Sequence, residues 1–182
     1  MTARIPAVDR ETAPAATRPL LDKLIAAFGK APNLFATIGQ SPAALGGYLA
    51  FIETLGMGAL NQREIELINV YVSEVNGCGY CLSAHSLLAG KAGLTRDETL
   101  AARAGRAATP RESAILALAL RIIRTGGGGA GGELARAREA GLSDGEIVEV
   151  IGHVASKAFT NAVALVAGTE IDFPRAPHLP QP

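Results

Sequence analysis

Two cysteines, Cys78 and Cys81, are the residues of this 182-residue chain whose type and spacing most clearly predict chemistry. Two intervening residues let a pair of thiols meet as a disulfide when the backbone brings their Cα atoms within about 7 Å. His85 follows Cys81 by four residues, so it shares one helix face with the cysteine, and its imidazole can take the thiol proton. The pattern predicts an acid–base-assisted redox dithiol.

The residues before the cysteines place the pair at the start of a helix. Asn76 and Gly77 break the chain direction between one expected helix and the next. The first turn of a helix has unpaired N–H groups and the positive end of the helix dipole. Both stabilise a thiolate, which is the reactive form of cysteine. We therefore expect the pair to be activated by its position as well as by the histidine.

Other interpretations of a Cys-x-x-Cys pair stay open. A zinc site takes four ligands, and the candidates are Cys78, Cys81, His85 and either His153 or Glu66. Against zinc, the chain has no second Cys-x-x-Cys and is long enough to fold without a metal. Covalently attached haem requires His directly after the second cysteine, where Leu82 stands. Two buried structural cysteines are the remaining alternative to the redox pair.

Composition and charge limit the class of protein. Lysine plus arginine and aspartate plus glutamate both number 17, so no basic excess is available to bind a nucleic-acid backbone. The first twenty residues lack the apolar stretch of a secretory signal. Glu149, His153 and Lys157 interrupt the most apolar later segment, 147–167. We expect a cytoplasmic protein that has no transmembrane helix and binds neither nucleic acid nor membrane.

Repeated capping signals divide the chain into helices. Each signal is a capping residue followed three positions later by an acid that can return a hydrogen bond to the cap. The signals are Thr95–Glu98, Thr109–Glu112, Ser143–Glu146 and the related Asn61–Glu64. Gly29, Gly93 and Gly141 stand where helices should end. The expected helices span 17–28, 41–57, 62–76, 79–92, 96–104, 110–124, 132–140 and 144–168.

These elements predict one all-α domain over residues 1–182. No segment alternates as a strand does, which disfavours a thioredoxin fold. The glycine-rich stretch 126–132 should be a flexible connection, because no Gly-Lys-Ser/Thr follows it as in a phosphate loop. The proline-rich tail, 174–182, should run extended over the surface or onto a neighbouring subunit. A faint repeat aligns 64–73 with 146–155 and suggests two related helical units, one of which carries the chemistry.

The residues around the cysteines resemble a known family. The stretch 63–73, the segment Asn76-Gly77-Cys78-Gly79-Tyr80-Cys81 and the pair Ala84-His85 are similar to the Glu…Cys-x-x-Cys-x-x-x-His signature of alkylhydroperoxidase D-like (AhpD-like) proteins in the carboxymuconolactone decarboxylase superfamily. Glu66, twelve residues before Cys78, takes the place of the signature's acid. The similarity covers about residues 20–174. The signature lies in 61–93.

The resemblance implies a compact all-α fold and thiol-dependent reduction of hydroperoxides through a redox-active disulfide. By position, Cys81 would attack the peroxide, Cys78 would resolve the product, and His85 and Glu66 would form a proton relay. It also implies a thiol or dithiol electron donor, such as a lipoyl-bearing or other redox protein, and a homo-oligomer, commonly a trimer or hexamer. No cofactor or metal is expected. The best-studied branch has His where this chain has Tyr80, so one relay member is missing.

Two other functions remain as alternatives. The superfamily includes cofactor-free lactone decarboxylases, although decarboxylation needs no cysteine pair, and a zinc-stabilised binding module would not be an enzyme. Glu74 is interpreted as a solvated helix charge rather than a second acid. His153 is interpreted as a hydrogen-bonded core or interface residue rather than a catalyst, and Tyr80 is expected to hydrogen-bond or pack in the pocket.

Overall fold

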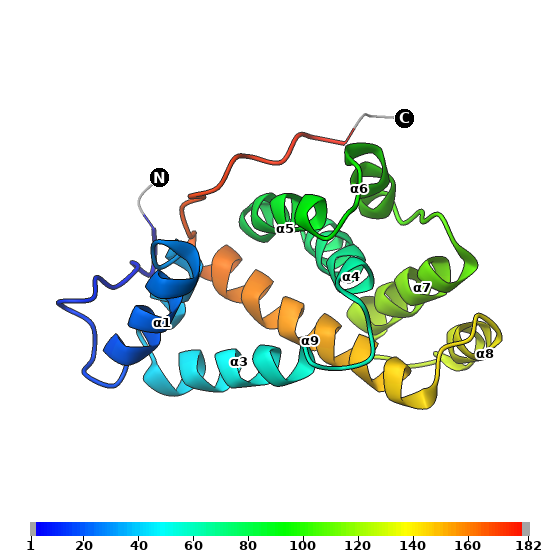
Figure 1. The fold of residues 1–182 in the computed structure, drawn as a ribbon, viewed down its shortest axis with the longest axis horizontal. Helices are drawn as coiled ribbons and strands as arrows, with labels where there is room; N and C mark the ends of the chain where they lie inside the picture. The colour runs from blue at the N-terminus through cyan, green and yellow to red at the C-terminus, as the bar shows by residue number, and fades with distance from the viewer. Residues whose placement is uncertain (1–2, 180–182) are drawn as a thin grey trace.

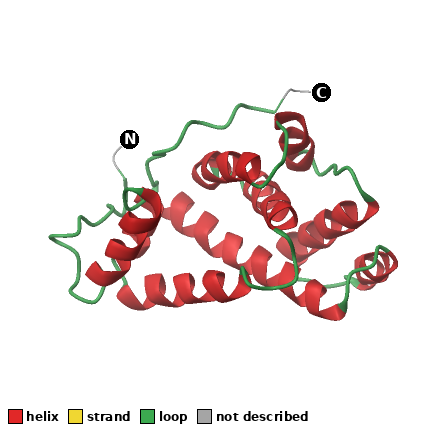
Figure 2. Cartoon of the chain, viewed as in Figure 1, coloured by secondary structure: helices red, strands yellow, loops and turns green. Residues whose placement is uncertain are grey.

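The computed structural model describes residues 3–179, which form nine α-helices and no strand (Figure 1 and Figure 2). In chain order these are α1 (Arg18–Phe28), α2 (Asn33–Ile38), α3 (Pro42–Leu55), α4 (Gln62–Val75), α5 (Gly79–Lys91), α6 (Arg96–Arg103), α7 (Pro110–Thr125), α8 (Gly131–Glu139) and α9 (Asp144–Ala167). Central α4 contacts α5, α6, α7 and α9, and α3 packs along α9. The predicted all-α fold is confirmed, and the eight expected helices agree with the observed bounds to within two residues.

The helix that the sequence analysis misses is α2. It has only six residues, too few to show a periodic pattern, and it follows Pro32, which provides no side-chain cap. Its apolar side chains are nonetheless buried, and Leu34, Ala36 and Ile38 belong to the same core cluster as the two cysteines. This short helix therefore forms part of the enclosure of the predicted site.

Four helices begin with the predicted capping boxes. At the starts of α4, α6, α7 and α9, the cap side chain accepts a hydrogen bond from the third helical residue, whose carboxylate accepts one from the cap backbone. Gly29, Gly93 and Gly141 have φ values of 78°, 87° and 86°, the left-handed geometry expected where helices end. The boxes fix the first turns of the two helices, α4 and α9, that supply charged groups to the site.

The glycine-rich connection is shorter than expected. Residues 126–130 form turns, and Gly126, Gly127 and Gly129 have positive φ. Gly131 and Gly132 already belong to α8. The turns reverse the chain so that α8 packs against α7.

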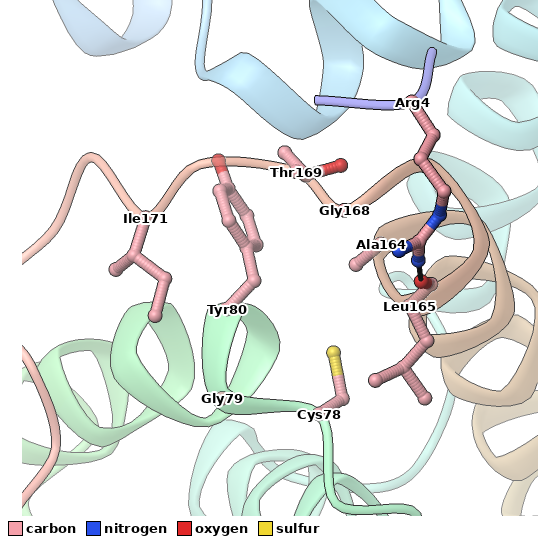
Figure 3. A pocket seen from close by; sticks show the side chains of 9 residues that line it. All are labelled: Arg4, Cys78, Gly79, Tyr80, Ala164, Leu165, Gly168, Thr169 and Ile171. Carbon is pink, nitrogen blue, oxygen red and sulfur yellow. Dashed lines mark hydrogen bonds between the residues drawn. The ribbon is translucent and has the colours of Figure 1, made fainter. Parts of the chain in front are cut away.

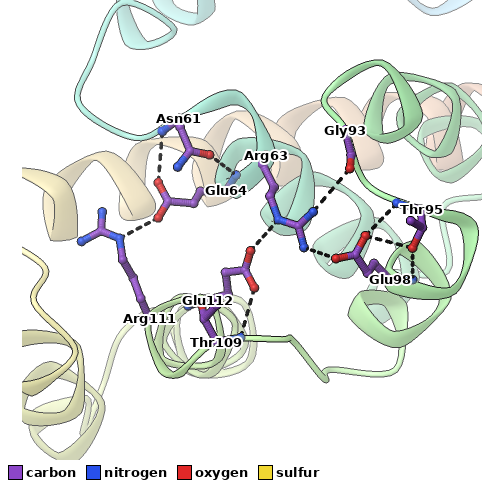
Figure 4. Close-up of polar contacts among 9 residues, drawn as sticks. All are labelled: Asn61, Arg63, Glu64, Gly93, Thr95, Glu98, Thr109, Arg111 and Glu112. Atoms are coloured by element: carbon purple, nitrogen blue, oxygen red, sulfur yellow. Dashed lines mark hydrogen bonds and ion pairs between the residues drawn. The ribbon is translucent and has the colours of Figure 1, made fainter.

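Two arginines join the starts of four helices, and Figure 4 shows their contacts with Glu64, Glu98 and Glu112. Arg63, in the first turn of α4, donates from Nε to Glu112 Oε1 at 2.7 Å and from Nη2 to Glu98 Oε1 at 2.6 Å. Arg111, in the first turn of α7, donates from Nε to Glu64 Oε1 and from Nη2 to Glu146 Oε1. The four acids are those of the capping boxes: Glu64, Glu98, Glu112 and Glu146. Each box is thereby tied to a neighbouring helix.

The contacts of these arginines follow a repeat that differs from the expected one. Arg63 and Arg111 are 48 residues apart, and so are Gly93 and Gly141, whose carbonyls accept from their Nη1 atoms. This offset relates α4–α6 to α7–α9, whereas the alignment of 64–73 with 146–155 relates α4 to α9. At the same offset Cys78 corresponds to Gly126. The second unit therefore has a glycine-rich turn where the first has its cysteines.

The longest helix, α9, passes through the fold. By length and composition it could cross a membrane, but half of its most apolar window is buried inside the protein. Its inner face packs against α4 and α7 in an aliphatic core. The same helix buries His153, Lys157 and Asn161, which follow one another at four-residue intervals. It brings polar groups into the core beside the cysteines.

The described part of the proline-rich tail lies on its own protomer. The backbone N–H of Ala176 donates to Ser83 Oγ in α5 at 3.1 Å, and Arg103 Nη1 in α6 donates to the carbonyl of Pro177 at 2.8 Å. Of the two alternatives expected for the tail, its described part therefore runs over the surface of its own protomer and not onto a neighbouring subunit. Residues 180–182 of the predicted tail lie outside the described residues.

Candidate active site

The turn between α4 and α5 presents the two cysteines. Asn76 ends α4, Gly77 adopts a φ of 65°, which side-chain-bearing residues rarely tolerate, and Cys78 caps the start of α5. Cys81 is the third residue of α5, so both sulfurs belong to its first turn. The predicted position at a helix start is confirmed.

Both cysteines are buried and free, with exposed fractions of 1% for Cys78 and 2% for Cys81. A hydrogen bond from the Cys78 thiol is the main cause that lowers the pKa of Cys81 to about 5. Burial opposes this shift, and Lys157, His85 and Asn161 add to it. The same contact with Cys81, together with burial, raises the pKa of Cys78. At neutral pH the pair therefore consists of a Cys81 thiolate and a Cys78 thiol.

A chain of polar contacts links Glu66, His85 and Lys157 beside Cys81. His85 Nδ1 lies 2.8 Å from Glu66 Oε2, and Asn69 Nδ2 donates to Glu66 Oε1 at 3.1 Å. Lys157 Nζ contacts the other ring nitrogen of His85, Nε2. Both ring nitrogens are thus engaged, Nδ1 by the carboxylate of Glu66 and Nε2 by the amine of Lys157. The fold brings Glu66 and His85 together as expected, and the buried Glu66 is not a solvated helix charge.

The charges in this cluster support one another. Burial alone would raise the pKa of Glu66, but His85, Lys157 and Asn69 outweigh it and lower the pKa. Burial lowers the pKa of Lys157, and the negative charges of Cys81 and Glu66 oppose that shift. One buried lysine thus interacts with two negatively charged groups. Neutralising any of the three groups changes the protonation of the others.

His85 acts on Cys81 less directly than their spacing suggests. Within residues 3–179 no hydrogen bond joins the two side chains, since the ring nitrogens contact Glu66 and Lys157 instead. Lys157 lowers the pKa of Cys81 more than His85 does, and Asn161 contributes a side-chain hydrogen bond. Activation of the thiolate therefore depends on α9 as well as on α5.

A cavity of about 330 Å³ opens onto Cys81. Helices α1, α2, α3, α5 and α9 supply most of its walls, which include His85 and Lys157, and Phe173 lines it just before the proline-rich tail. Five of the wall residues are aromatic: Phe28, Phe35, Tyr48, Tyr80 and Phe173. Such a cavity can hold an apolar molecule against the thiolate.

Comparisons with known proteins find similar sequences and a similar fold. Residues 42–125 match the carboxymuconolactone decarboxylase family. A stretch of 48 residues is 40% identical to alkyl hydroperoxide reductase AhpD of Mycobacteroides abscessus, a match that spans 26% of this chain and 27% of that protein. The fold superposes on an alkylhydroperoxidase AhpD core, an uncharacterized peroxidase-related protein from Ralstonia eutropha, with a TM-score of 0.84. That structure is 22% identical over 94% of this chain and 93% of the other. Residues 42–125 therefore resemble the carboxymuconolactone decarboxylase family, and the chain has an AhpD-like fold.

A further solved structure shares this AhpD-like fold but carries a different activity in its name. The debrominase Bmp8, in complex with 2,3,4-tribromopyrrole, superposes with a TM-score of 0.78 at 19% identity over 94% of this chain and 93% of the other. At these identities the likeness concerns the fold alone. The reaction of the present AhpD-like chain must be argued from its own site.

Lys157 and Asn161 were not predicted as site residues. In the sequence, Lys157 is notable only as a charge unsuited to a membrane span. Together with His153, these residues form a series at four-residue spacing on an otherwise apolar helix. Polar residues on the apolar face of a helix must find partners when buried. This spacing is the signal that could have identified α9 as part of the AhpD-like site.

Tyr80 is locked rather than free to replace the missing histidine. Its hydroxyl donates to Asp172 Oδ1 at 2.8 Å and accepts from the backbone N–H of Leu34 at 3.1 Å. Its ring meets Phe173 edge to face, with centroids 5.7 Å apart. Burial raises the pKa of Tyr80, so the phenol stays protonated. Tyr80 both hydrogen-bonds and packs.

Glu74 and His153 lie outside the contacts around Cys81. Glu74 forms an ion pair with Arg103 at 2.8 Å, so it joins α4 to α6 and is not simply a solvated charge. His153 is buried, as expected, but its Nε2 has no hydrogen-bond partner among the described residues, contrary to the expected hydrogen-bonded role. Burial lowers the pKa of His153.

The candidate zinc ligands do not lie together as a metal site requires. Within residues 3–179 no three His, Cys, Asp or Glu side chains form a group that could hold a metal ion. His85 is engaged at both ring nitrogens, and Glu66 is held by His85 and Asn69. The arrangement supports a thiolate site more than a four-ligand metal site.

Proposed function

We propose that this AhpD-like protein is a thiol-dependent oxidoreductase that reduces hydroperoxides through Cys81 and Cys78. The supporting observation is a buried Cys81 whose pKa is lowered to about 5, with a thiol neighbour and an apolar cavity in front of it. The thiolate is the form of cysteine that attacks peroxide oxygen. Because the cavity walls are largely apolar, they favour an organic hydroperoxide over hydrogen peroxide.

In the proposed reaction, the Cys81 thiolate attacks the outer peroxide oxygen and the O–O bond breaks. The alkoxide takes a proton and leaves as an alcohol, and Cys81 becomes a sulfenic acid. Cys78 then attacks the Cys81 sulfur, which forms the disulfide and releases water. Lys157 is placed to supply the proton, and the Glu66–His85 pair can replace it. Two thiol groups of a donor then reduce the disulfide and become a disulfide themselves.

Peroxide consumption by the cysteine variants tests this proposal. With cumene hydroperoxide and excess dithiothreitol, Cys81→Ser should show no consumption above background. Reduced Cys78→Ser, freed of dithiothreitol, should consume one equivalent of peroxide and stall as a sulfenic acid. Alkylation should add two groups to the reduced wild-type protein and none after oxidation. Two alkyl groups on oxidant-treated protein, or full activity in Cys81→Ser, would contradict the proposal. If the protein were instead a lactone decarboxylase, Cys81→Ser should keep full decarboxylase activity towards a lactone substrate, because that reaction needs no cysteine pair.

Reductive debromination is a second candidate, favoured by the aromatic cavity walls. Five aromatic side chains surround the space in front of Cys81 and suit a planar ring. The same thiolate and the same disulfide would serve this reaction. Bromide release from a brominated pyrrole, with no consumption of cumene hydroperoxide, would favour debromination over peroxide reduction.

A further inference from the structure

The two cysteines open onto different cavities. Cys81 lines the cavity described above, and Cys78 does not. Cys78 lines a separate space of about 500 Å³, which Cys81 does not reach. Figure 3 shows the Cys78 sulfur pointing into this space, with Tyr80 on one side and Ala164 and Leu165 on the other. We refer to it as the Cys78 cavity.

Tyr80 separates the two spaces. Among the described residues it alone lines both of them. Hydrogen bonds to Asp172 and Leu34 and the edge-to-face contact with Phe173 hold its ring in place. A ring fixed at these points is a stable partition. A molecule in one cavity therefore reaches one sulfur and not the other.

The Cys78 cavity has an apolar wall and two polar features. Arg4 donates from Nε to the carbonyl of Val166 at 2.6 Å and contacts the carbonyl of Leu165, while its Nη1 makes no hydrogen bond with residues 3–179. The hydroxyl of Thr169 is buried and also has no partner in that part of the chain. The apolar wall consists of Ala164, Leu165 and Ile171. A molecule with an apolar arm, a hydrogen-bonding group and an anionic group would complement these walls.

We propose that the Cys78 cavity is the docking site of the reductant, and that this reductant is a thiol carried on an apolar arm with an anionic group. The proposal rests on the redox cycle above and gives each cysteine its own route: the oxidising substrate reaches Cys81 and the reducing thiol reaches Cys78. Because Cys78 is only 1% exposed, the donor must extend its thiol into the cavity rather than meet the sulfur at the surface.

The chemistry of reduction agrees with attack on Cys78. The donor thiolate bonds to the Cys78 sulfur, the bond between Cys78 and Cys81 breaks, and its electron pair leaves on Cys81. A second donor thiolate then attacks the donor sulfur of the mixed disulfide and releases Cys78, which takes a proton. Thiol–disulfide exchange is faster when the leaving thiol has a low pKa, and the pKa of Cys81 is about 5 while that of Cys78 is raised.

Single-cysteine proteins test the two routes without any peroxide. Cys81→Ser retains Cys78, and Cys78→Ser retains Cys81; each is labelled with dithiobisnitrobenzoate, an aromatic disulfide with carboxylate groups. Adding Leu165→Trp should slow labelling of Cys78 by about 10-fold or more and leave labelling of Cys81 within about 2-fold, because access controls the rate. Leu87→Trp, in the wall of the Cys81 cavity, is the matched control and should do the reverse.

The outcome does not depend on whether the protein reduces peroxides. If Leu165→Trp slows both cysteines equally, or neither, the separate routes are wrong, even if the peroxidase proposal holds. Thiol labelling of the unfolded proteins and circular dichroism of the folded ones check that the variants are intact. Thr169→Met, which fills the same cavity from another side, gives a second test should Leu165→Trp fail to fold.

The identity of the reductant has its own test. The oxidised protein is mixed with nitrothiobenzoate, an anionic thiol, or with mercaptopyridine, a neutral one. Arg4→Gln should slow the anionic thiol by about 3–10-fold and leave the neutral thiol within about 2-fold, because a single charge contact is lost. Acid quenching and peptide mass spectrometry should find the mixed disulfide on Cys78. Equal slowing of both thiols, or a mixed disulfide on Cys81, would overturn the proposal.

Discussion

Lys157 is the residue whose charge most favours the Cys81 thiolate. We predict that Lys157→Met raises the pKa of Cys81 from about 5 by about one to two units, because a nearby opposite charge shifts a pKa by roughly that amount. Thiolate absorbance in the ultraviolet, followed against pH, measures the shift. The variant should lose thiolate in the acidic range, where the wild-type protein still has it, and match the wild type at alkaline pH.

Lys91→Met is the matched control for this prediction. Lys91 also lines the cavity but lies at its exposed rim and is not among the groups that lower the pKa of Cys81. Its replacement should leave the titration unchanged. If both lysine variants give the wild-type curve, the thiolate is held by Cys78, His85 and Asn161 without Lys157.

Glu66 acts on Cys81 through two intermediates. Its carboxylate orients His85 and raises the pKa of Lys157, so Glu66→Gln weakens both groups at once. We predict that Cys81 reacts with peroxide about 10–100-fold more slowly in Glu66→Gln at neutral pH, the usual effect of losing an orienting or acid–base group. Stopped-flow kinetics from about pH 6 to about pH 9 should show the difference shrink, because weaker Lys157 and His85 raise the pKa of Cys81 in the variant and its thiolate forms fully only at alkaline pH.

Glu74→Gln is the control on the same helix. Glu74 pairs with Arg103 and lies outside the Cys81 cavity, so its variant should react at the wild-type rate. Cys81→Ser should not react at any pH. A wild-type pH profile in folded Glu66→Gln would show that the carboxylate does not take part.

At the residue scale, local spacing predicts only part of the site. Cys78 is the cap residue of α5, and Cys81 and His85 lie in that helix. Their spacing in the sequence is therefore enough to predict that they lie close together. Glu66 could be assigned only through the family resemblance, because periodicity does not set one helix against another. Lys157 is 72 residues from His85, and contacts at that distance depend on tertiary packing.

At the element scale, the arginine contacts hold the helix starts in register. Arg111 pairs with Glu64, whose side chain is 5% exposed. We predict that Arg111→Ala lowers the free energy of unfolding by about 2 kcal/mol, because it leaves a buried carboxylate unpaired. Urea titration measures the change, and Arg138→Ala, whose pair with Asp144 is at the surface, should have almost none. Comparable losses in both variants would contradict the argument.

The stabilising effect of Arg111 should also depend on pH. A hydrogen bond from the Ser143 backbone, followed by one from Arg111, lowers the pKa of Glu146 from 4.5 to about 2. Because the pKa is lower in the folded state, the stability from Glu146 is present above 4.5 and is lost as pH falls towards 2. The difference between Arg111→Ala and wild type in urea titrations should therefore shrink across this range. A difference that stays constant would exclude a contribution from the carboxylate charges.

The elements themselves could be predicted closely because their ends are marked locally. Capping boxes and terminal glycines involve residues only three or four positions apart, so the sequence carries the complete signal. Helix α2 has six residues and no side-chain cap, and its helical state depends on burial against other elements. The 48-residue repeat also depends on tertiary structure. It is recognised from the equivalent contacts that Arg63 and Arg111 make with neighbouring helices.

At the scale of the whole molecule, one face is unusually apolar for a protomer on its own. On α9, Val148 and Ile151 are 65% and 43% exposed, and Phe51 on the adjacent α3 is 45% exposed. Exposed apolar side chains that gather on neighbouring helices can mark an interaction surface. The proline-rich tail, by contrast, lies over its own α5 and α6 as far as it is described, and does not itself indicate a partner.

We predict a homo-oligomer that buries this α3–α9 face. Light scattering at micromolar concentration should give a multiple of the protomer mass, and Val148→Glu combined with Ile151→Glu should give the monomer, because two charges would be buried without partners at the interface. Ile25→Glu, at a comparably exposed apolar position on α1, should leave the oligomer intact.

The thiolate titration of Cys81 should be the same in monomer and oligomer, since its pKa depends on groups within one chain. A wild-type monomer across this concentration range would contradict the prediction. Dissociation by Ile25→Glu as well would place the interface elsewhere.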